Sequence, residues 1–384
     1  MKGISLILTV ALLLCLLPVS AGAAQLEVAG KSALLMDVAT GTILVEQNPH
    51  ERLSPASVTK IMTMLLIMEA IDSGAITLED TVTASEAAAA KGGSQVYLKV
   101  GETMSVSDML KSIAVSSAND CACAMAEHIA GSEEAFVERM NSRAKELGMN
   151  DTHFVNCTGL DDGPEAENHK TSAHDIALMS RQLLKNHPEI KKFTTIWMDT
   201  IRGGAFGLSN TNKLVRFYPG ATGLKTGFTS GAGYCLSATA QRDGMELIAV
   251  VMGAATSQER NAACKQLLDH GFANYALICP DLTDTDTLVT VKLGKSPGVA
   301  ARLGADPSML IEKAQRNSVT TEVSLEESVT APVAAGQKLG TMTVRTGEQV
   351  LTAVPLVAAE AVERLSWTDL FCRVLKRAAM AKTA

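Results

Sequence analysis

Ser57-Val58-Thr59-Lys60 opens a long apolar run, and this stretch decides how the rest of the chain is interpreted. Pro55 and Ser57 predict the start of a helix, and Gly74 predicts its end. The helix is apolar nearly all round, so we expect it to be buried and to hold Ser57 rigidly. Residues three apart on a helix share a face, which brings the Lys60 amine within reach of the Ser57 hydroxyl. A serine hydroxyl needs such a base before it acts as a nucleophile.

Lys60 is the residue that favours catalysis over a purely structural interpretation of this stretch. A serine that opens a helix is most often an N-cap, and Ser-x-x-Lys is too short a motif to stand alone. A lysine in the first helical turn, however, opposes the helix dipole, and no other charged residue follows before Glu69. Burial of an ammonium there favours its neutral form, and a general base must be a neutral amine.

Ser117-Ala118-Asn119 is a second short element, which on turn propensity alone is a capping or turn segment. In the catalytic interpretation, the Ser117 hydroxyl passes a proton between Lys60, Ser57 and a leaving amine. Asn119 offers both a donor and an acceptor, so it can hold a backbone amide of a substrate.

Lys225-Thr226-Gly227 is the third element, within a segment predicted to be a strand. Lys225 and Thr226 are expected to face a substrate carboxylate, while Gly227 leaves room for the substrate backbone. A second cation near Lys60 would also lower the Lys60 pKa. The preceding residues look like a phosphate-binding loop, but Leu224 stands where that motif needs glycine. The three elements together, in this order, predict a serine-based acyl transfer.

Composition excludes several other classes of protein. The chain has 384 residues, enough for more than one domain, and its net charge of −7 argues against nucleic acid as a partner. The seven histidines form no H-E-x-x-H pattern and the eight cysteines form no C-x-x-C pair. We therefore expect no metal site, and most thiols are expected to be small buried hydrophobes. Whether two of them form a disulfide stays open.

Residues 1–23 are typical of a secretory signal. Lys2 gives the positive start, residues 4–17 form a short apolar stretch, and Ala21-Gly22-Ala23 offers a cleavage site. A retained membrane anchor is the alternative, but the apolar stretch is shorter than the roughly 20 residues that a spanning helix needs. We therefore expect the chain to be exported.

Residues 24–278 are predicted to form one α+β domain. A β-hairpin is expected over 31–48, and three consecutive strands are expected at 223–228, 234–241 and 246–253, separated by turns at 229–233 and 242–244. The helical segments are expected at 57–73, at 106–128 with a break at 116–120, and at 133–147, 173–184 and 260–272.

Residues 279–360 are predicted to form a small β-domain, with short strands at 288–293, 320–325, 338–345 and 350–354. Residues 361–384 are predicted to form an amphipathic helix. Its apolar side carries Val362, Leu365, Leu370, Phe371, Val374 and Leu375. Interspersed basic residues suit a helix that lies in a membrane interface. The alternative is a helix docked on the protein's own surface, which has the same pattern.

Taken together, these elements resemble the serine-type D-alanyl-D-alanine carboxypeptidases, the low-molecular-mass penicillin-binding proteins. The segments that look like those of the family are Pro55–Lys60, Thr158–Asp162, Gly223–Gly227, and Ala331–Val333 with Gly336-Gln337. The resemblance covers nearly the whole mature chain. It implies a β-lactamase/DD-peptidase-like fold, in which helices flank an antiparallel sheet, followed by the small all-β domain and the C-terminal anchoring helix.

The resemblance also implies an acyl transfer that needs no cofactor. Ser57 would attack the carbonyl between the two terminal D-alanines of a peptidoglycan stem peptide, with Lys60 as the base and Ser117 relaying the proton. The backbone N–H groups of Ser57 and Phe228 would form the oxyanion hole. The implied partners are stem peptides, β-lactam antibiotics and the outer face of the cytoplasmic membrane, with no nucleic acid.

Two alternatives stay open. A β-lactamase shares the nucleophile and the fold but needs a carboxylate base for deacylation. The loop Asp161–Glu167 offers carboxylates, but Glu165 and Asn168 lack the expected four-residue spacing. Ala118 in place of aspartate favours the carboxypeptidase, and Phe228 stands where some relatives have histidine. A non-catalytic peptidoglycan-binding relative is the second alternative, against which the complete catalytic set argues.

Overall fold

A five-stranded antiparallel sheet forms the centre of the larger part of the molecule. The computed structural model describes residues 26–163, 165–283 and 285–380, so the predicted signal peptide lies outside the described residues. The strand order is β2-β1-β9-β8-β7. These strands are β1 (Ser32–Asp37), β2 (Ile43–Gln47), β7 (Ala221–Thr229), β8 (Gly233–Arg242) and β9 (Met245–Ala254). The predicted hairpin and the three predicted consecutive strands therefore meet in one sheet, and the predicted α+β class is confirmed.

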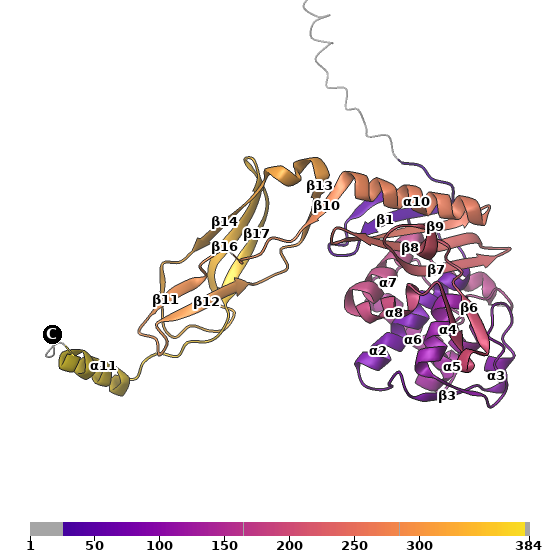
Figure 1. Ribbon diagram of the computed structural model, residues 1–384, viewed down its shortest axis with the longest axis horizontal. Coiled ribbons are helices and arrows are strands. Elements are labelled where there is room, and N and C mark those ends of the chain that lie inside the picture. Colours follow the sequence, from indigo (N-terminus) through magenta and orange to yellow (C-terminus); the bar gives the residue numbers. More distant parts are fainter. Residues whose placement is uncertain (1–25, 164, 284, 381–384) are drawn as a thin grey trace, which may run out of the picture.

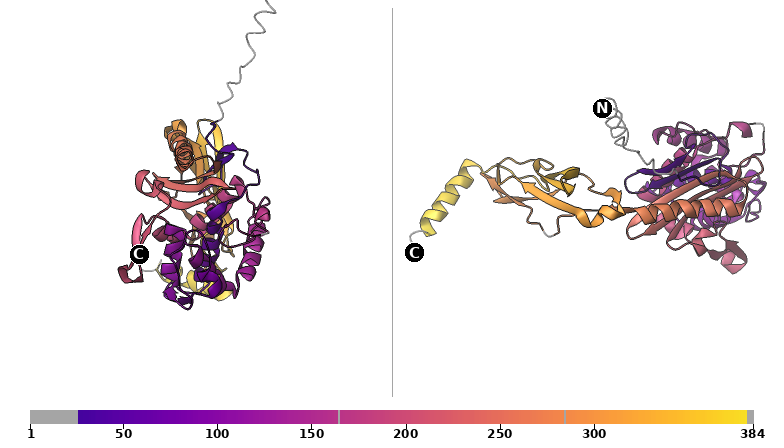
Figure 2. Two further views of the ribbon diagram at one scale, coloured as in Figure 1. Left: turned by 90° about the vertical axis from the view of Figure 1, so that its right-hand side faces the viewer. Right: turned by 90° about the horizontal axis from the view of Figure 1, so that it is seen from above.

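Helices cover both faces of this sheet (Figure 1). Helix α10 (Ser257–Asn274) lies along one face, and a lobe of helices packs on the other (Figure 2). Strand β1 is buried along its whole length, with Leu34 in the core on the helical-lobe side and Leu35 in the core beneath α10. Successive side chains of a strand point to opposite faces, which explains why this strand is apolar without alternation.

The helical lobe surrounds α2 (Lys60–Asp72). Its other helices are α3 (Glu86–Ala89), α4 (Val106–Ser116), α5 (Asn119–Ala130), α6 (Glu133–Glu146), α7 (Ala173–Asn186) and α8 (Lys191–Thr194), whereas Leu214 of the short helix α9 (Leu214–Phe217) packs in the core beneath α10. Two short antiparallel strand pairs complete the lobe, β3 (Thr81–Thr83) with β4 (Thr103–Ser105) and β5 (Met198–Ile201) with β6 (Phe206–Ser209). The predicted break near 116–120 is where α4 ends and α5 begins.

The serine lies just before α2 rather than in its first turn. Ser57 belongs to the 3₁₀ turn η1 (Ala56–Thr59), and α2 begins at Lys60. Ala56 has a φ of 49°, a left-handed conformation that non-glycine residues seldom adopt. This turn reverses the chain so that Ser57 faces away from the helix core while Lys60 is fully buried in it.

The second part of the molecule is a β-domain that extends away from the five-stranded sheet (Figure 1). Its six-stranded sheet has the order β14-β16-β17-β12-β11-β15. The strands are β11 (Leu288–Lys292), β12 (Gly298–Leu303), β14 (Val319–Leu325), β15 (Ser328–Thr330), β16 (Lys338–Thr346) and β17 (Gln349–Ala358). Strands β12 and β15 were not predicted. A separate pair, β10 (Tyr275–Ile278) with β13 (Met309–Glu312), joins the end of α10 to this domain.

The C-terminal helix α11 (Trp367–Met380) begins later than predicted. Val362 was assigned to the helix, which is wrong, because it bridges to Val333 and is only 3% exposed within the β-domain core. Helix α11 lies at the end of the molecule farthest from the five-stranded sheet (Figure 1). Its exposed large apolar side chains are Trp367, Phe371, Val374 and Leu375. Among the described residues, every helix is too short or too polar to cross a bilayer.

Candidate active site

Ser57 and Lys60 meet as the sequence predicts. The Lys60 Nζ atom lies 2.9 Å from Ser57 Oγ and donates to the carbonyl oxygen of Thr158 at 2.7 Å. The lysine side chain is fully buried, and this burial lowers the Lys60 pKa from 10.5 to about 7, although Cys157 and Asp120 oppose the shift. The lowered pKa favours the neutral amine, which can donate a hydrogen to the Thr158 carbonyl while its lone pair accepts the Ser57 proton.

Two glycines press against the turn that carries Ser57. A Cβ atom at Gly159 would overlap the Ala56 carbonyl, and a Cβ atom at Gly227 would lie 2.5 Å from the Pro55 carbonyl oxygen. The prediction that Gly227 leaves room for the substrate backbone therefore needs correction. The space that this glycine saves is filled by the turn of the nucleophile itself, which lets strand β7 approach Ser57 closely.

Ser117 and Asn119 each have a buried side-chain oxygen atom without a hydrogen-bond partner among the described residues. Ser117 has a φ of 63° at the C-terminus of α4, and within the described part of the chain its hydroxyl has no hydrogen-bond partner. Asn119 donates from Nδ2 to the Gly92 carbonyl at 2.7 Å, which leaves Oδ1 as its free buried atom among the described residues. Asn119 Oδ1 can thus accept a hydrogen bond from a substrate amide, while one of the two Nδ2 hydrogens is donated to Gly92.

Lys225 and Thr226 lie on β7, the edge strand beside η1. Lys225 is 1% exposed, and its Nζ atom donates to the Thr226 carbonyl at 3.0 Å. Burial, followed by repulsion from Lys60 and Arg260, lowers the Lys225 pKa well below its usual value. The predicted second lysine therefore lies near Lys60, but its own lowered pKa favours the neutral amine, and burial rather than Lys225 lowers the Lys60 pKa. A bound carboxylate would favour the charged form of Lys225.

Arg260 is a further cation that the sequence reasoning missed. It lies in the first turn of α10, is 5% exposed, and contacts the ring of Tyr234 at 5.8 Å from the centroid. Its hydrogen-bond partner within the described residues is the Asn261 side chain. A cation in the first turn opposes the helix dipole, which is the same signal that pointed to Lys60.

Phe228 lies near the end of β7, and its side chain is exposed. Its ring is 54% exposed and stacks on Tyr234 at 4.2 Å between centroids. Only its backbone is available for an oxyanion hole. Among the described residues, no group of three histidine, cysteine, aspartate or glutamate side chains is arranged to hold a metal ion.

Comparison with known proteins identifies this arrangement. The sequence model of the D-alanyl-D-alanine carboxypeptidase family matches residues 19–256, and that of the penicillin-binding protein 5 C-terminal domain matches residues 283–364. The chain belongs to the D-alanyl-D-alanine carboxypeptidase family. The family assignment supports the activity of a serine D-alanyl-D-alanine carboxypeptidase over that of a β-lactamase.

Individual family members match most of the chain. It is 44% identical over 350 residues to the D-alanyl-D-alanine carboxypeptidase DacF of Bacillus subtilis, covering 90% of this chain and 89% of that protein. The structure of penicillin-binding protein 5 from Haemophilus influenzae has 31% sequence identity, covers 89% of this chain and all of that chain, and gives a TM-score of 0.74. The ampicillin-bound penicillin-binding protein D2 of Listeria monocytogenes has 32% identity, covers 64% of this chain and 99% of that chain, and gives a TM-score of 0.59.

Proposed function

We propose that this carboxypeptidase removes the terminal D-alanine from peptidoglycan stem pentapeptides through an acyl-enzyme on Ser57. The observation that carries the proposal is the buried Lys60 amine, whose Nζ lies 2.9 Å from Ser57 Oγ and whose pKa is lowered to about 7 by burial. The neutral amine takes the hydroxyl proton as Ser57 Oγ bonds to the carbonyl carbon between the two D-alanines.

The remaining residues act on the atoms around this new bond. The backbone N–H groups of Ser57 and Phe228 hold the oxyanion, a contribution of roughly 3–4 kcal/mol per donor. The Ser117 hydroxyl relays the proton from Lys60 to the amine nitrogen of the departing D-alanine as the C–N bond breaks. Its lack of another partner among the described residues leaves it available for that transfer. Water then hydrolyses the ester and frees Ser57.

We assign substrate recognition to Asn119, Lys225 and Thr226. Asn119 Oδ1 accepts the N–H of a substrate amide, and Lys225 with Thr226 holds the terminal carboxylate. Because β7 is an edge strand, an extended peptide can add beside it. The Listeria relative was solved with bound ampicillin, which is a penicillin. We expect penicillins to acylate Ser57 in this chain.

The direct experiment is release of D-alanine from a synthetic pentapeptide, together with peptide mapping of a fluorescent penicillin adduct. We expect stoichiometric D-alanine and an adduct on Ser57. The carboxylates of the loop that was weighed for a β-lactamase, Asp161, Asp162, Glu165 and Glu167, are all exposed. We therefore expect the penicillin adduct to persist, and rapid turnover of penicillin would contradict the proposal.

Lys225→Ala is expected to lower kcat/KM for the pentapeptide by about 10- to 100-fold, because it removes a charge-assisted hydrogen bond worth roughly 1.5–3 kcal/mol. The loss should shrink for a peptide that ends in an amide rather than a carboxylate. Lys213→Ala, at an exposed lysine near the same strand, is the matched control. An unchanged kcat/KM in Lys225→Ala would contradict the role of this residue.

We further propose that the chain is exported and attaches to the outer face of the cytoplasmic membrane through α11. The exposed apolar side chains of this helix support attachment, since they would insert among lipid headgroups. A chain ending at Leu365 is expected to lose binding to anionic lipid vesicles while keeping its kcat/KM for a soluble peptide within twofold. Continued vesicle binding would refute the anchor. The cut must follow Val362, because removing this buried residue would also destabilise the β-domain.

A further inference from the structure

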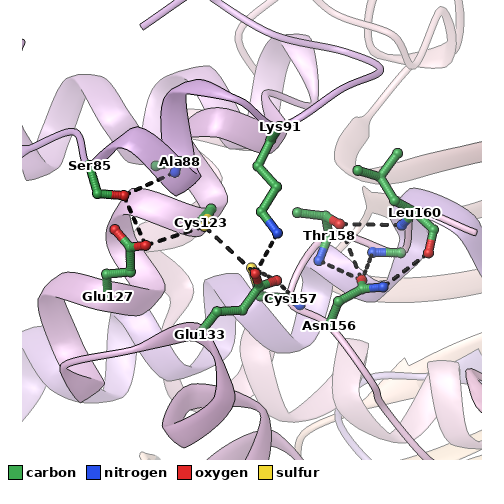
Figure 3. Close-up of polar contacts among 11 residues, drawn as sticks. Ser85, Ala88, Lys91, Cys123, Glu127, Glu133, Asn156, Cys157, Thr158 and Leu160 are labelled. Atoms are coloured by element: carbon green, nitrogen blue, oxygen red, sulfur yellow. Dashed lines mark hydrogen bonds and ion pairs between the residues drawn. The ribbon is translucent and has the colours of Figure 1, made fainter. Parts of the chain in front are cut away.

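Lys91 and Glu133 form an ion pair beside the active site that the proposed reaction does not use. The Lys91 Nζ atom lies 2.5 Å from Glu133 Oε2, with the two side chains 25% and 16% exposed (Figure 3). Lys91 belongs to the loop after α3, and Glu133 is the first residue of α6. The pair therefore joins two segments that face each other across the end of the helical lobe.

Glu133 holds the segment that supports the catalytic base. Its Oε1 atom accepts hydrogen bonds from the Cys157 backbone N–H and from the Cys157 thiol, both at 3.2 Å. The carbonyl of Cys157 accepts from the Thr63 hydroxyl at 2.6 Å, and the carbonyl of Thr158 accepts from Lys60 Nζ at 2.7 Å. Asn156 Oδ1 accepts from the backbone N–H groups of Thr158 and Gly159, so the position of the Thr158 carbonyl depends on Glu133 together with Asn156.

Lys91 holds the opposite wall. The next residue, Gly92, offers the carbonyl that accepts from Asn119 Nδ2 at 2.7 Å, and the Ser94 carbonyl accepts from the Asn119 backbone N–H at 2.7 Å. Residues 91–100 contain no helix or strand, so side-chain contacts must fix this loop.

A cavity of about 490 Å³ adjoins the pair and is lined also by Asn156, Thr158 and Leu160. The segment that carries the Thr158 carbonyl thus has open space on the side of the ion pair, while Gly159 packs closely against Ala56 on another side. Loss of the ion pair would let this segment shift toward the cavity.

We propose that the Lys91–Glu133 ion pair is a positioning clamp, which sets the Thr158 carbonyl against the Lys60 amine and the Gly92 carbonyl against Asn119 at the same time. Neither residue touches the substrate, so both act through the groups that they hold. This inference rests on the proposed roles of Ser57 and Lys60.

The test compares Lys91→Met, Glu133→Gln and Lys91→Arg by the second-order rate constant for acylation with fluorescent penicillin, measured from pH 5.5 to 9.5. In Lys91→Met and Glu133→Gln the high-pH limit should fall at least tenfold, because the amine is misaligned even when it is neutral. Lys91→Arg keeps the cation and should stay within threefold of the wild type. The double variant Lys91→Met/Glu133→Gln should be acylated no more slowly than the slower of its two single variants, because the two residues act as one unit.

The pH at which the acylation rate constant is half of its high-pH limit provides a second readout. A general loss of stability would not move this midpoint in opposite directions in the two variants. Asp120 of α5 and Cys157 of its loop raise the Lys60 pKa, and Lys60 in turn lowers the pKa of Lys225 of β7 and of His169. Glu133→Gln leaves the Lys91 cation unpaired and should lower the midpoint. Lys91→Met leaves the carboxylate unpaired and should raise it.

Glu69→Gln is the matched control. It breaks the Arg143–Glu69 ion pair, which joins α6 to α2 and whose side chains are about as exposed as those of Lys91 and Glu133. Arg143 lies near the end of α6 that is farther from Glu133. Acylation of Glu69→Gln should stay within twofold of the wild type. The clamp is refuted if Lys91→Met and Glu133→Gln meet three conditions. Both variants have wild-type melting temperatures, their acylation rate constants at high pH stay within twofold of the wild type, and the pH midpoints of their acylation rates are unchanged. A wild-type protein that penicillin does not label on Ser57 would instead refute the proposed function.

Discussion

Replacing Ser57 by alanine is expected to abolish both penicillin labelling and D-alanine release. The acyl-enzyme is an ester between the Ser57 oxygen and the substrate carbonyl carbon. Without this oxygen, the covalent intermediate cannot form. Removing one member of such a catalytic unit costs about as much as removing all of it. The rate should therefore fall to the background of the assay.

The matched control for this variant is Ser73→Ala, at the other end of α2, whose hydroxyl only caps the helix by donating to the Ala70 carbonyl. It should keep full labelling and D-alanine release. The nucleophile assignment fails if Ser57→Ala protein with a wild-type melting temperature still forms a covalent penicillin adduct.

Lys60→Met is expected to lower the acylation rate by about 10²- to 10⁴-fold, the usual contribution of a positioned general base. Methionine fills a similar volume, so the buried helix should pack as before. The rate constant for labelling by fluorescent penicillin, measured near pH 8 where the wild-type amine is neutral, gives the effect directly. A loss below tenfold would mean that another group takes the Ser57 proton.

The same variant is expected to melt at a temperature at or above that of the wild type. The Lys60 pKa is about 7 in the folded chain and 10.5 when exposed, so the unfolded chain binds more protons between these values. The folded state is therefore penalised below pH 7 and recovers stability as the pH rises toward 10.5. Removing the amine removes this penalty, and a clearly lower melting temperature at pH 7 would contradict the burial argument.

The sequence predicts the site well where a side chain carries the signal. The three-residue spacing correctly placed the Lys60 amine beside Ser57, and the conflict of Lys60 with the helix dipole pointed to its function. Arg260 likewise lies in the first turn of a helix, so the same reasoning would have singled it out as a buried cation that acts on Lys225. Strand β1 and strands β7 to β9 followed from runs of apolar and β-branched residues.

The features that escaped prediction depend on backbone atoms and on contacts between distant segments. The Thr158 and Gly92 carbonyls orient Lys60 and Asn119, but a carbonyl group is present at every residue and leaves no mark in the sequence. Gly227 was correctly singled out, yet only the fold reveals that its missing side chain makes room for Pro55. Val362 fits an apolar helical stripe equally well, and its burial comes from pairing with Val333 in the β-domain.

The pH dependence of acylation tests the central claim most directly, because the claim is that a neutral Lys60 amine takes the Ser57 proton. Only the neutral amine can accept a proton, so the rate must rise as the pH passes the Lys60 pKa of about 7. The second-order rate constant for fluorescent penicillin should increase about tenfold between pH 6 and pH 8 and then level off. A rate that is flat across this range, or that rises only near pH 10 where an ordinary lysine titrates, would contradict the account.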